Sequence, residues 1–368
     1  MRSKTIDAAI ATLSSSDTSA LEGALFHWCK ETWPRAVLNG VRSKSGSGAS
    51  SELIFLDIDK GEGQGLETLV LRLNSRWPVY PIQDLHHQGR CLEILGRALP
   101  SSLKVAKVEA VETRILAGID RPFLAMSYLE GRLAPDQPAY VLEGWLYDLD
   151  KREREQLWHA GVAAMLAVHN SHLSAEESKE LSLPLAGETA LQRMLNYWSL
   201  FLRHVESNGD YPVLRAAVSW LHDNQPNYDS EPRLVWGDAS LRNMMFEGLA
   251  PSALLDFEFA HLGLWELDVA FYPLMDFVMA DGFAGGAERL SGFAGLSDTM
   301  DYYEALSGRK MVHREYFLRM ALSYMALSTT RVYQRLAING SISSQAVYDN
   351  PPLQLLEDIM SGKRALPA

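Results

Sequence analysis

Cysteine is scarce in this chain. It has two cysteines in 368 residues, Cys29 and Cys91, and no C-x-x-C pair. Two cysteines cannot supply the disulfide framework of a small secreted domain, and the missing pair argues against structural zinc or thiol redox chemistry. We expect both thiols to be buried as small hydrophobic side chains.

Long apolar runs are also missing. The two most apolar windows, 262–280 and 316–327, are both interrupted by charged residues, so neither is predicted to span a membrane. The N-terminus carries Arg2 and Lys4 but no apolar core of a signal peptide. These absences predict a cytoplasmic protein with no membrane partner.

Several catalytic motifs are absent. The chain lacks the G-x-x-x-x-G-K-[ST] pattern of P-loop proteins and the G-x-S-x-G elbow of α/β-hydrolases. Its ten histidines are scattered, and none stands with a carboxylate at metalloprotease spacing. His169 closes a predicted helix, where we expect it to interact with the helix dipole.

Positive charge is in the minority. The chain has 34 basic and 46 acidic residues, a net charge of −12, which argues against nucleic acid as a partner. Residues 1–129 hold 15 basic and 14 acidic side chains, whereas residues 130–368 hold 19 and 32. An acidic second part would attract cationic substrates such as aminoglycosides or choline-like amines.

The order of predicted elements indicates a two-part α+β protein, because this length suits two domains or lobes. Residues 1–40 are predicted as a helical extension, residues 41–129 as a small strand-rich lobe, and residues 130–368 as a larger helical lobe. Expected strands cover 53–58, 68–73 and 123–128, with a helix over 84–99. Helices are expected to begin near Asp150, where Glu153 completes a capping box, and near Leu191, Val213, Glu266, Ser297 and His313.

Three short strand-like pieces, 234–237, 243–246 and 253–257, interrupt the helical part. Asp238 and Asn243 follow the first piece, and Asp256 follows a turn expected over 247–252. The five-residue spacing matches the Asp-x-x-x-x-Asn loop of phosphoryl-transfer enzymes, in which Asp accepts the hydroxyl proton and Asn binds magnesium. Taken alone, Asp and Asn are also common turn residues.

With these residues the sequence resembles the aminoglycoside phosphotransferase and choline kinase-like family, over residues 40–280 and most closely over 234–268. Within that group it is similar to the kinase-like domain associated with acyl-CoA dehydrogenases. The resemblance implies a protein-kinase-like bilobal fold, Asp238 as the catalytic residue, Mg²⁺ held by Asn243, Asp256 and Glu258, and Asp268 as a brace of the catalytic loop. Trp236 stands where the wider family commonly has His.

The resemblance also implies an ATP site in the strand-rich lobe. A Gly/Ser loop containing Gly46, Ser47 and Gly48 would cover the phosphates, and Arg72 stands where the family offers a Lys. Gln88 occupies the position of the Glu that usually pairs with that Lys. Backbone groups near Met126 and Tyr128 would bond adenine.

The sequence therefore predicts an ATP- and Mg²⁺-dependent phosphotransferase acting on a hydroxyl of a small molecule. Two alternatives remain open: a nucleotide-binding pseudokinase, suggested by Arg72 and Gln88, and a metal-dependent phosphohydrolase using Asp238, Asp256 and Glu258. The acceptor is undecided between a cationic compound and a hydroxyacyl thioester or another metabolic hydroxyl compound. A monomer and a homodimer are both compatible with the sequence.

Overall fold

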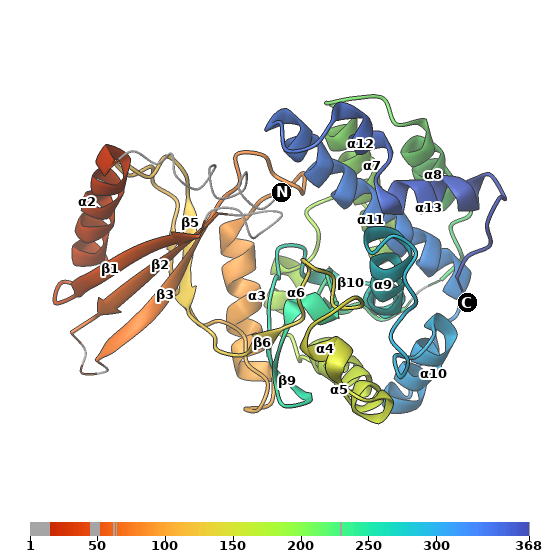
Figure 1. Cartoon of the computed structure of the whole chain (residues 1–368), viewed down its shortest axis with the longest axis horizontal. Helices are drawn as coiled ribbons and strands as arrows, with labels where there is room; N and C mark the ends of the chain where they lie inside the picture. The colour runs from red at the N-terminus through yellow and green to blue at the C-terminus, as the bar shows by residue number, and fades with distance from the viewer. Residues whose placement is uncertain (1–14, 45–51, 62, 64, 229, 368) are drawn as a thin grey trace. The chain divides into compact units, whose positions relative to one another are not determined.

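The computed structural model describes residues 15–44, 52–61, 63, 65–228 and 230–367 (Figure 1). The chain divides into two compact units. The first comprises the described residues up to Pro78, together with Gln83–Gly89 and Ala106–Leu129, and the second comprises Val79–Ile82, Arg90–Val105 and the chain from Glu130 onward. Within the described residues no helix combines the length and apolar character needed to cross a lipid bilayer.

The first unit is built on an antiparallel five-stranded sheet of order β1-β2-β3-β5-β4. Its strands are β1 Val37–Lys44, β2 Glu52–Asp59, β3 Leu66–Leu73, β4 Val108–Glu112 and β5 Phe123–Ser127. Along β2, buried and partly exposed side chains alternate, as expected for a strand with one face on a core. The three strands predicted in this part are confirmed, each to within two residues at either end.

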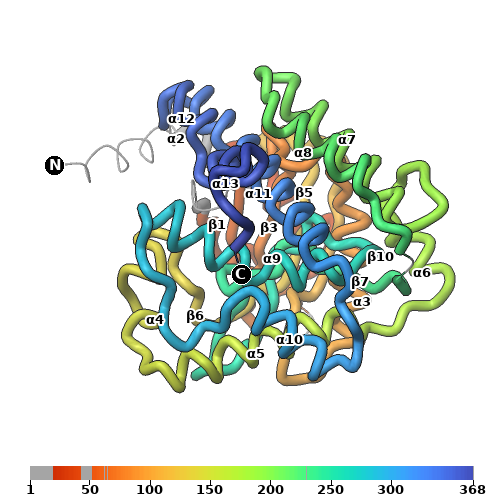
Figure 2. The backbone as a smooth tube through the Cα atoms, turned by 90° about the vertical axis from the view of Figure 1, so that its right-hand side faces the viewer, coloured from red at the N-terminus to blue at the C-terminus, as the bar shows by residue number. Residues whose placement is uncertain are grey.

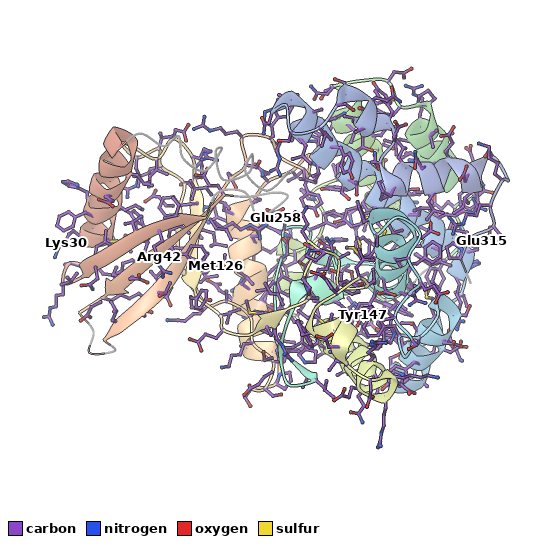
Figure 3. The ribbon with its side chains drawn as sticks, viewed as in Figure 1. Lys30, Arg42, Met126, Tyr147, Glu258 and Glu315 are labelled. Carbon is purple, nitrogen blue, oxygen red and sulfur yellow. The ribbon has the colours of Figure 1, made fainter. Side chains whose placement is uncertain are left out.

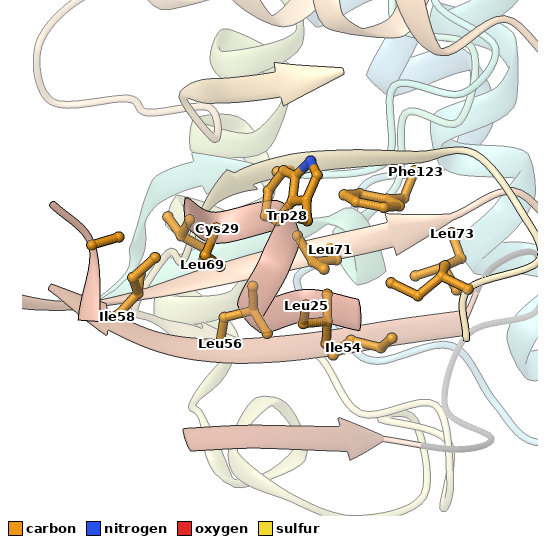
Figure 4. Packing of buried hydrophobic residues seen from close by; sticks show 13 residues of the cluster. Leu25, Trp28, Cys29, Ile54, Leu56, Ile58, Leu69, Leu71, Leu73 and Phe123 are labelled. Carbon is orange, nitrogen blue, oxygen red and sulfur yellow. The ribbon is translucent and has the colours of Figure 1, made fainter. Parts of the chain in front are cut away.

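Helix α2, Ser15–Thr32, packs on that sheet (Figure 4). Leu25, Trp28 and Cys29 of α2 join residues of β2, β3 and β5 in one buried cluster, in which the ring of Trp28 meets that of Phe123 edge-on at 5.0 Å. Both cysteines are buried and unpaired, as predicted. The helix thus belongs to the core of the strand-rich unit.

The second unit is mainly helical, and α11 is its central helix (Figures 1 and 2). Helix α11 contacts α7, α8, α9, α12 and α13. The helices are α4 Trp145–Asp148, α5 Lys151–His169, α6 Ala175–Glu180, α7 Ala190–Glu206, α8 Pro212–Asp223, α9 Trp265–Val278, α10 Leu296–Ser307, α11 Arg314–Ile338, α12 Ser344–Tyr348 and α13 Pro351–Met360, with a π-helical turn at Met279–Phe283. Helix α3, Leu85–Ala98, runs across the division between the two units.

The helix starts follow the sequence closely. The capping box predicted at Asp150 and Glu153 opens α5, with both reciprocal hydrogen bonds formed. A second box, Thr189 with Gln192, opens α7. The six helix starts predicted in this part lie within one residue of the observed ones.

Two small sheets interrupt the helices. One pairs β7 Arg233–Val235 with β10 His261–Gly263, and the other has the order β6-β8-β9, from Arg132–Leu133, Met244–Glu247 and Ala250–Leu254. The turn expected over 247–252 is shorter than predicted, because Glu247 pairs with Ala250 and leaves only Gly248 and Leu249 between the strands. Gly248 has φ +61°, a left-handed conformation that suits glycine in a tight hairpin. The third piece, predicted to reach 257, ends as a strand at Leu254.

Candidate active site

A loop carrying Asp238 follows β7 and ends in a 3₁₀ turn, Leu241–Asn243. Its sharpest point is Gly237, with φ +89°. A Cβ at this position would lie 2.7 Å from the carbonyl oxygen of Phe259. Only glycine therefore fits here, and the close approach fixes the loop against the segment that follows Asp256.

Asp268, in the first turn of α9, holds this loop from behind. Its carboxylate accepts the backbone N–H groups of Trp236 at 2.7 Å and Gly237 at 2.8 Å, and its side chain is fully buried. The bracing role predicted for Asp268 is thereby confirmed. A buried carboxylate needs such partners, because an unpaired charge in the interior is costly.

His169 extends the brace. One ring nitrogen, Nε2, lies 2.9 Å from Asp268 Oδ2, and the other, Nδ1, lies 2.7 Å from the hydroxyl of Tyr303. The Tyr303 hydroxyl also accepts a hydrogen bond from Arg309 at 3.1 Å. The helix-dipole explanation predicted for His169 is thus incomplete: both nitrogens are used in a buried network. In the sequence, the burial of His169 is indicated by its position after Met165 and Val168, which lie on the buried face of α5.

Asn243 ties the two ends of the loop together. The side-chain Nδ2 of Asn243 donates to the backbone carbonyl of Asp238 at 2.9 Å. The backbone carbonyl of Asn243 accepts the N–H of Leu255 at 2.8 Å. The amide nitrogen is therefore occupied, which leaves the side-chain oxygen Oδ1 as the candidate ligand atom. Asp238 lies in the loop and Asn243 in the 3₁₀ turn, and the strand expected from residue 243 begins at Met244.

The carboxylate of Asp238 is poorly compensated. Its Oδ1 is buried and has no hydrogen-bond partner among the described residues. Burial raises the pKa of Asp238 to about 6, the Arg242 guanidinium opposes that rise, and the nearby Asp256 carboxylate adds to it. At neutral pH the group is still mostly ionised, with a basicity suited to accepting a proton.

Asp256 follows β9 in a left-handed backbone conformation, with φ 59°. Such a conformation is uncommon for a residue other than glycine and is typical of functional sites. The indole N–H of Trp236 donates to the carbonyl of Leu255 at 2.7 Å, and its ring stacks on Phe257 at 5.6 Å. The tryptophan that replaces the expected histidine thus joins the Asp238 loop to the Asp256 segment.

The donor set suits a hard divalent cation. Asn243 Oδ1 and the Asp256 carboxylate are oxygen ligands of the kind that Mg²⁺ prefers, and Mg²⁺ in proteins commonly takes only one or two carboxylates and completes its shell with phosphate and water. Among the described residues, no three His, Cys, Asp or Glu side chains come together to hold a metal. Glu258, shown in Figure 3, therefore does not join Asp238 and Asp256 in a three-carboxylate cluster.

The model of the phosphotransferase enzyme family matches residues 44–306. The chain belongs to this family. A human relative, acyl-CoA dehydrogenase family member 11, is 23% identical over 294 residues, covering 77% of this chain but 35% of the relative, so the chain spans about a third of that protein's length. This phosphotransferase family member has the α+β protein-kinase-like fold predicted from its sequence.

Two solved structures illustrate that fold. The GDP and kanamycin complex of APH(2″)-IIIa has a TM-score of 0.57 and 15% identity, over 92% of this chain and 99% of that one. A macrolide 2′-phosphotransferase type I has the same TM-score and identity, over 95% and 98%. At this identity the likeness shows the fold alone.

The predicted nucleotide residues of this family member lie in its strand-rich unit. Arg72 stands on β3 between Leu53 of β2 and Leu124 of β5. Gln88, on α3, is buried, and its Oε1 has no hydrogen-bond partner among the described residues. Gly46, Ser47 and Gly48 lie outside the described residues.

Backbone groups of the strand expected to bind adenine are already used in pairing within the sheet. Met126, labelled in Figure 3, pairs with Val70 and Val108 inside the sheet. The N–H of Tyr128 donates to the Thr68 carbonyl at 3.1 Å, and its side chain is exposed. An adenine donor from this stretch would therefore come from a residue beyond Tyr128.

An aromatic wall near the carboxylates was not foreseen. The hydroxyls of Tyr80 and Tyr324 lie 2.8 Å apart, and the ring of Tyr80 stacks on Phe259 at 5.6 Å. Burial, together with the charges of Asp238, Asp256 and Glu258, raises the pKa of Tyr80 well above its usual value. Both tyrosines therefore stay protonated. These contacts join residues far apart in sequence, so no local pattern predicts them.

Proposed function

We propose that this protein transfers the γ-phosphoryl group of ATP to a hydroxyl of a small molecule. The observation that carries the proposal is the Asp238 carboxylate: it stands on a loop braced by Asp268, and one of its oxygens is buried without a partner among the described residues. Such an oxygen is suited to receive the proton of an acceptor hydroxyl. Membership of the phosphotransferase family supports phosphoryl transfer, and the GDP bound in the APH(2″)-IIIa complex supports the use of a nucleotide.

The proposed reaction balances as an in-line displacement. The acceptor oxygen forms a bond to the γ-phosphorus, the bond from that phosphorus to the β–γ bridging oxygen breaks, and the hydroxyl proton passes to Asp238. Asn243 and Asp256 would hold Mg²⁺, which neutralises phosphate charge when it is bound. The residues of the chain orient the hydroxyl and take its proton, so most of the rate enhancement comes from positioning.

The two alternatives differ in their support. A phosphohydrolase built on Asp238, Asp256 and Glu258 needs a carboxylate cluster, and the described residues contain no such group. A pseudokinase is favoured by Arg72 and Gln88, which replace the usual Lys and Glu pair. Turnover, measured directly, separates the pseudokinase from the kinase.

The test compares Asp238→Asn with Asp223→Asn, an exposed residue at the end of α8. ATP binding is measured by calorimetry with and without Mg²⁺, and ADP formation is measured with a panel of hydroxyl compounds. We expect Asp238→Asn to lower turnover by about 10²–10⁴-fold, the usual contribution of a general base, while ATP affinity is kept. Asp223→Asn should behave like the parent protein.

Full turnover by Asp238→Asn would refute the assignment of the base. ATP binding without turnover on any acceptor in the parent protein would establish the pseudokinase. Absence of ATP binding, with or without Mg²⁺, would rule out both an ATP-dependent kinase and an ATP-binding pseudokinase.

A further inference from the structure

Arg242 is a cation inside the catalytic loop that the proposed reaction does not use. It lies in the 3₁₀ turn Leu241–Asn243, four residues after Asp238 and directly before Asn243. Its side chain is 24% exposed, so most of it is removed from solvent. The loop therefore holds a guanidinium beside the group that would receive the acceptor proton.

The hydrogen-bonding capacity of this guanidinium is largely unspent. An arginine offers five N–H donors in a planar fork. In the structure Nη1 reaches Asp136 Oδ1 at 3.4 Å, a long contact, and Nε is buried with no partner among the described residues. The side chain of Asp136 is itself 55% exposed, and exposed pairs of this kind contribute little.

The charge of Arg242 acts on the site. It opposes the rise that burial causes in the pKa of Asp238, and it likewise opposes the rise in the pKa of the buried Tyr140 hydroxyl. Both effects place the guanidinium within electrostatic reach of the proposed base. Burial lowers the pKa of Arg242, but the charges of Asp136 and Asp238 outweigh that effect and raise it overall, so the group stays a cation. A ligand oxyanion would pair with donors that these carboxylates leave unused.

We propose that Arg242 binds an oxyanion of the acceptor, a carboxylate or a phosphate, while the acceptor hydroxyl lies at Asp238. A guanidinium matches both groups through two parallel N–H···O bonds, which would set the orientation as well as the affinity of the acceptor. The inference rests on the proposed function and narrows its substrate to hydroxy acids and hydroxy phosphates. It runs against the cationic acceptors that the overall acidity of residues 130–368 favours, because a guanidinium recognises an oxyanion through directional hydrogen bonds and not through net charge.

The test uses four compounds that share one hydroxymethyl group and differ in the group attached to it: glycolate, ethylene glycol monophosphate, ethanolamine and ethylene glycol. Binding of each to the full chain is measured by ligand-observed NMR in the presence of Mg²⁺ and a non-hydrolysable ATP analogue. ADP formation from ATP is measured in parallel. Glycolate and the monophosphate separate the two oxyanion types.

We expect at least one of the two anions to bind about tenfold or more tightly than ethanolamine and ethylene glycol, the effect of one charge-assisted hydrogen-bonded pair. Arg242→Gln should abolish this preference, and Arg242→Glu should shift it toward ethanolamine. The affinity for the ATP analogue should stay within about twofold in both variants. Arg215→Gln, which removes an exposed arginine paired with Glu206 and Asp210, is the matched control.

Asp136→Asn separates recognition from structure. If Arg242 served only its ion pair with Asp136, removing either partner would have the same effect. The proposal instead predicts that Asp136→Asn keeps or strengthens anion binding, because it frees a donor of Arg242.

Three results would overturn the inference. They are equal or better binding of ethanolamine by the parent protein, no detectable binding of either anion, and an anion preference that survives Arg242→Gln. Loss of ATP-analogue binding in Arg242→Gln would assign Arg242 to the nucleotide instead. Failure of the proposed function is visible separately, as anion binding that never leads to ADP.

Discussion

At the scale of single residues, the carboxylate proposed as the base also lowers the stability of the fold. Asp238 has a buried oxygen without a partner among the described residues, and its pKa of about 6 lies above the ordinary value of 3.8. The folded state therefore binds this proton more tightly than the unfolded state does. Between about pH 4 and 6 the carboxyl is protonated in the folded state and ionised in the unfolded state. The free energy of unfolding therefore falls as pH rises through this range.

Asp238→Asn should accordingly stabilise the fold while it removes activity. At pH 8 the wild-type carboxylate is ionised in both states and its burial is unfavourable, so we expect the variant to be more stable by about 1 kcal/mol, a figure reduced for the partial exposure of the side chain. Below about pH 4 the carboxyl is protonated in both states, and the difference should vanish. Denaturant unfolding at both pH values measures this, with Asp223→Asn as the reference. A gain in stability that is equal at both pH values would contradict the explanation.

At the scale of elements, α9 is the helix that holds the Asp238 loop in place. Its first turn supplies Asp268, which takes two backbone N–H groups of the loop and meets His169 of α5. Helices α5 and α9 and the loop after strand β7 are thereby joined through one buried carboxylate. The loop is held by hydrogen bonds to one carboxylate, so a substitution of Asp268 that removes one of these bonds should displace the loop.

Asp268→Asn tests this element. An amide presents one acceptor oxygen in place of two, so a buried backbone N–H is left without a partner, at a cost of about 3 kcal/mol. We expect the melting temperature to fall by about 5 °C and turnover to fall while the base itself is unchanged. Thermal unfolding and ADP formation measure the two effects.

Asp281→Asn is the control for that experiment, because Asp281 pairs with Arg364 at 2.8 Å near the surface. It removes an acidic side chain just beyond α9 with little expected effect on either measurement. A similar loss in both variants would show that Asp268 has no special role in the loop.

The same elements show what the sequence could predict. The strands over 53–58 and 68–73 and the box at Asp150 rest on neighbours along the chain, and the structure contains them. The role of His169 rests on a partner 99 residues away, and the Tyr80–Tyr324 pair on one 244 residues away. Contacts between residues so far apart in the chain produce no local sequence pattern, so the sequence does not predict them.

In the candidate site, too, the features that depend on neighbouring residues are predictable and those that depend on the folded structure are not. The spacing of Asp238 and Asn243 is local and predicts a catalytic loop, and the family resemblance predicts the bracing role of Asp268. The role proposed for Arg242 was not visible, because it depends on which of its donors find partners after folding. The metal and nucleotide roles of Glu258, Arg72 and Gln88 remain predictions.

At the scale of the whole molecule, the net charge of −12 affects how an anionic nucleotide arrives. Repulsion between like charges slows association and is screened by salt, because the Debye length falls from about 30 Å at 0.01 M to about 8 Å at 0.15 M ionic strength. The acidic excess lies in residues 130–368, which include the Asp238 loop.

We therefore expect kcat/KM for the Mg²⁺–ATP complex to rise about twofold between these two ionic strengths, with kcat at saturation unchanged. Steady-state kinetics in potassium chloride, with a neutral acceptor held at constant concentration, measures the effect. A kcat/KM that falls with salt would mean that local positive charge outweighs the net charge of the molecule.

The left-handed backbone of Asp256 has a consequence for protein engineering. Glycine adopts φ near 59° more readily than aspartate does, so replacing Asp256 with glycine relieves strain and removes a proposed metal ligand. A library of this chain screened for heat tolerance or expression yield would be enriched in such replacements. The survivors would be robust and inactive, so improvement of this scaffold has to be selected on turnover from the first round.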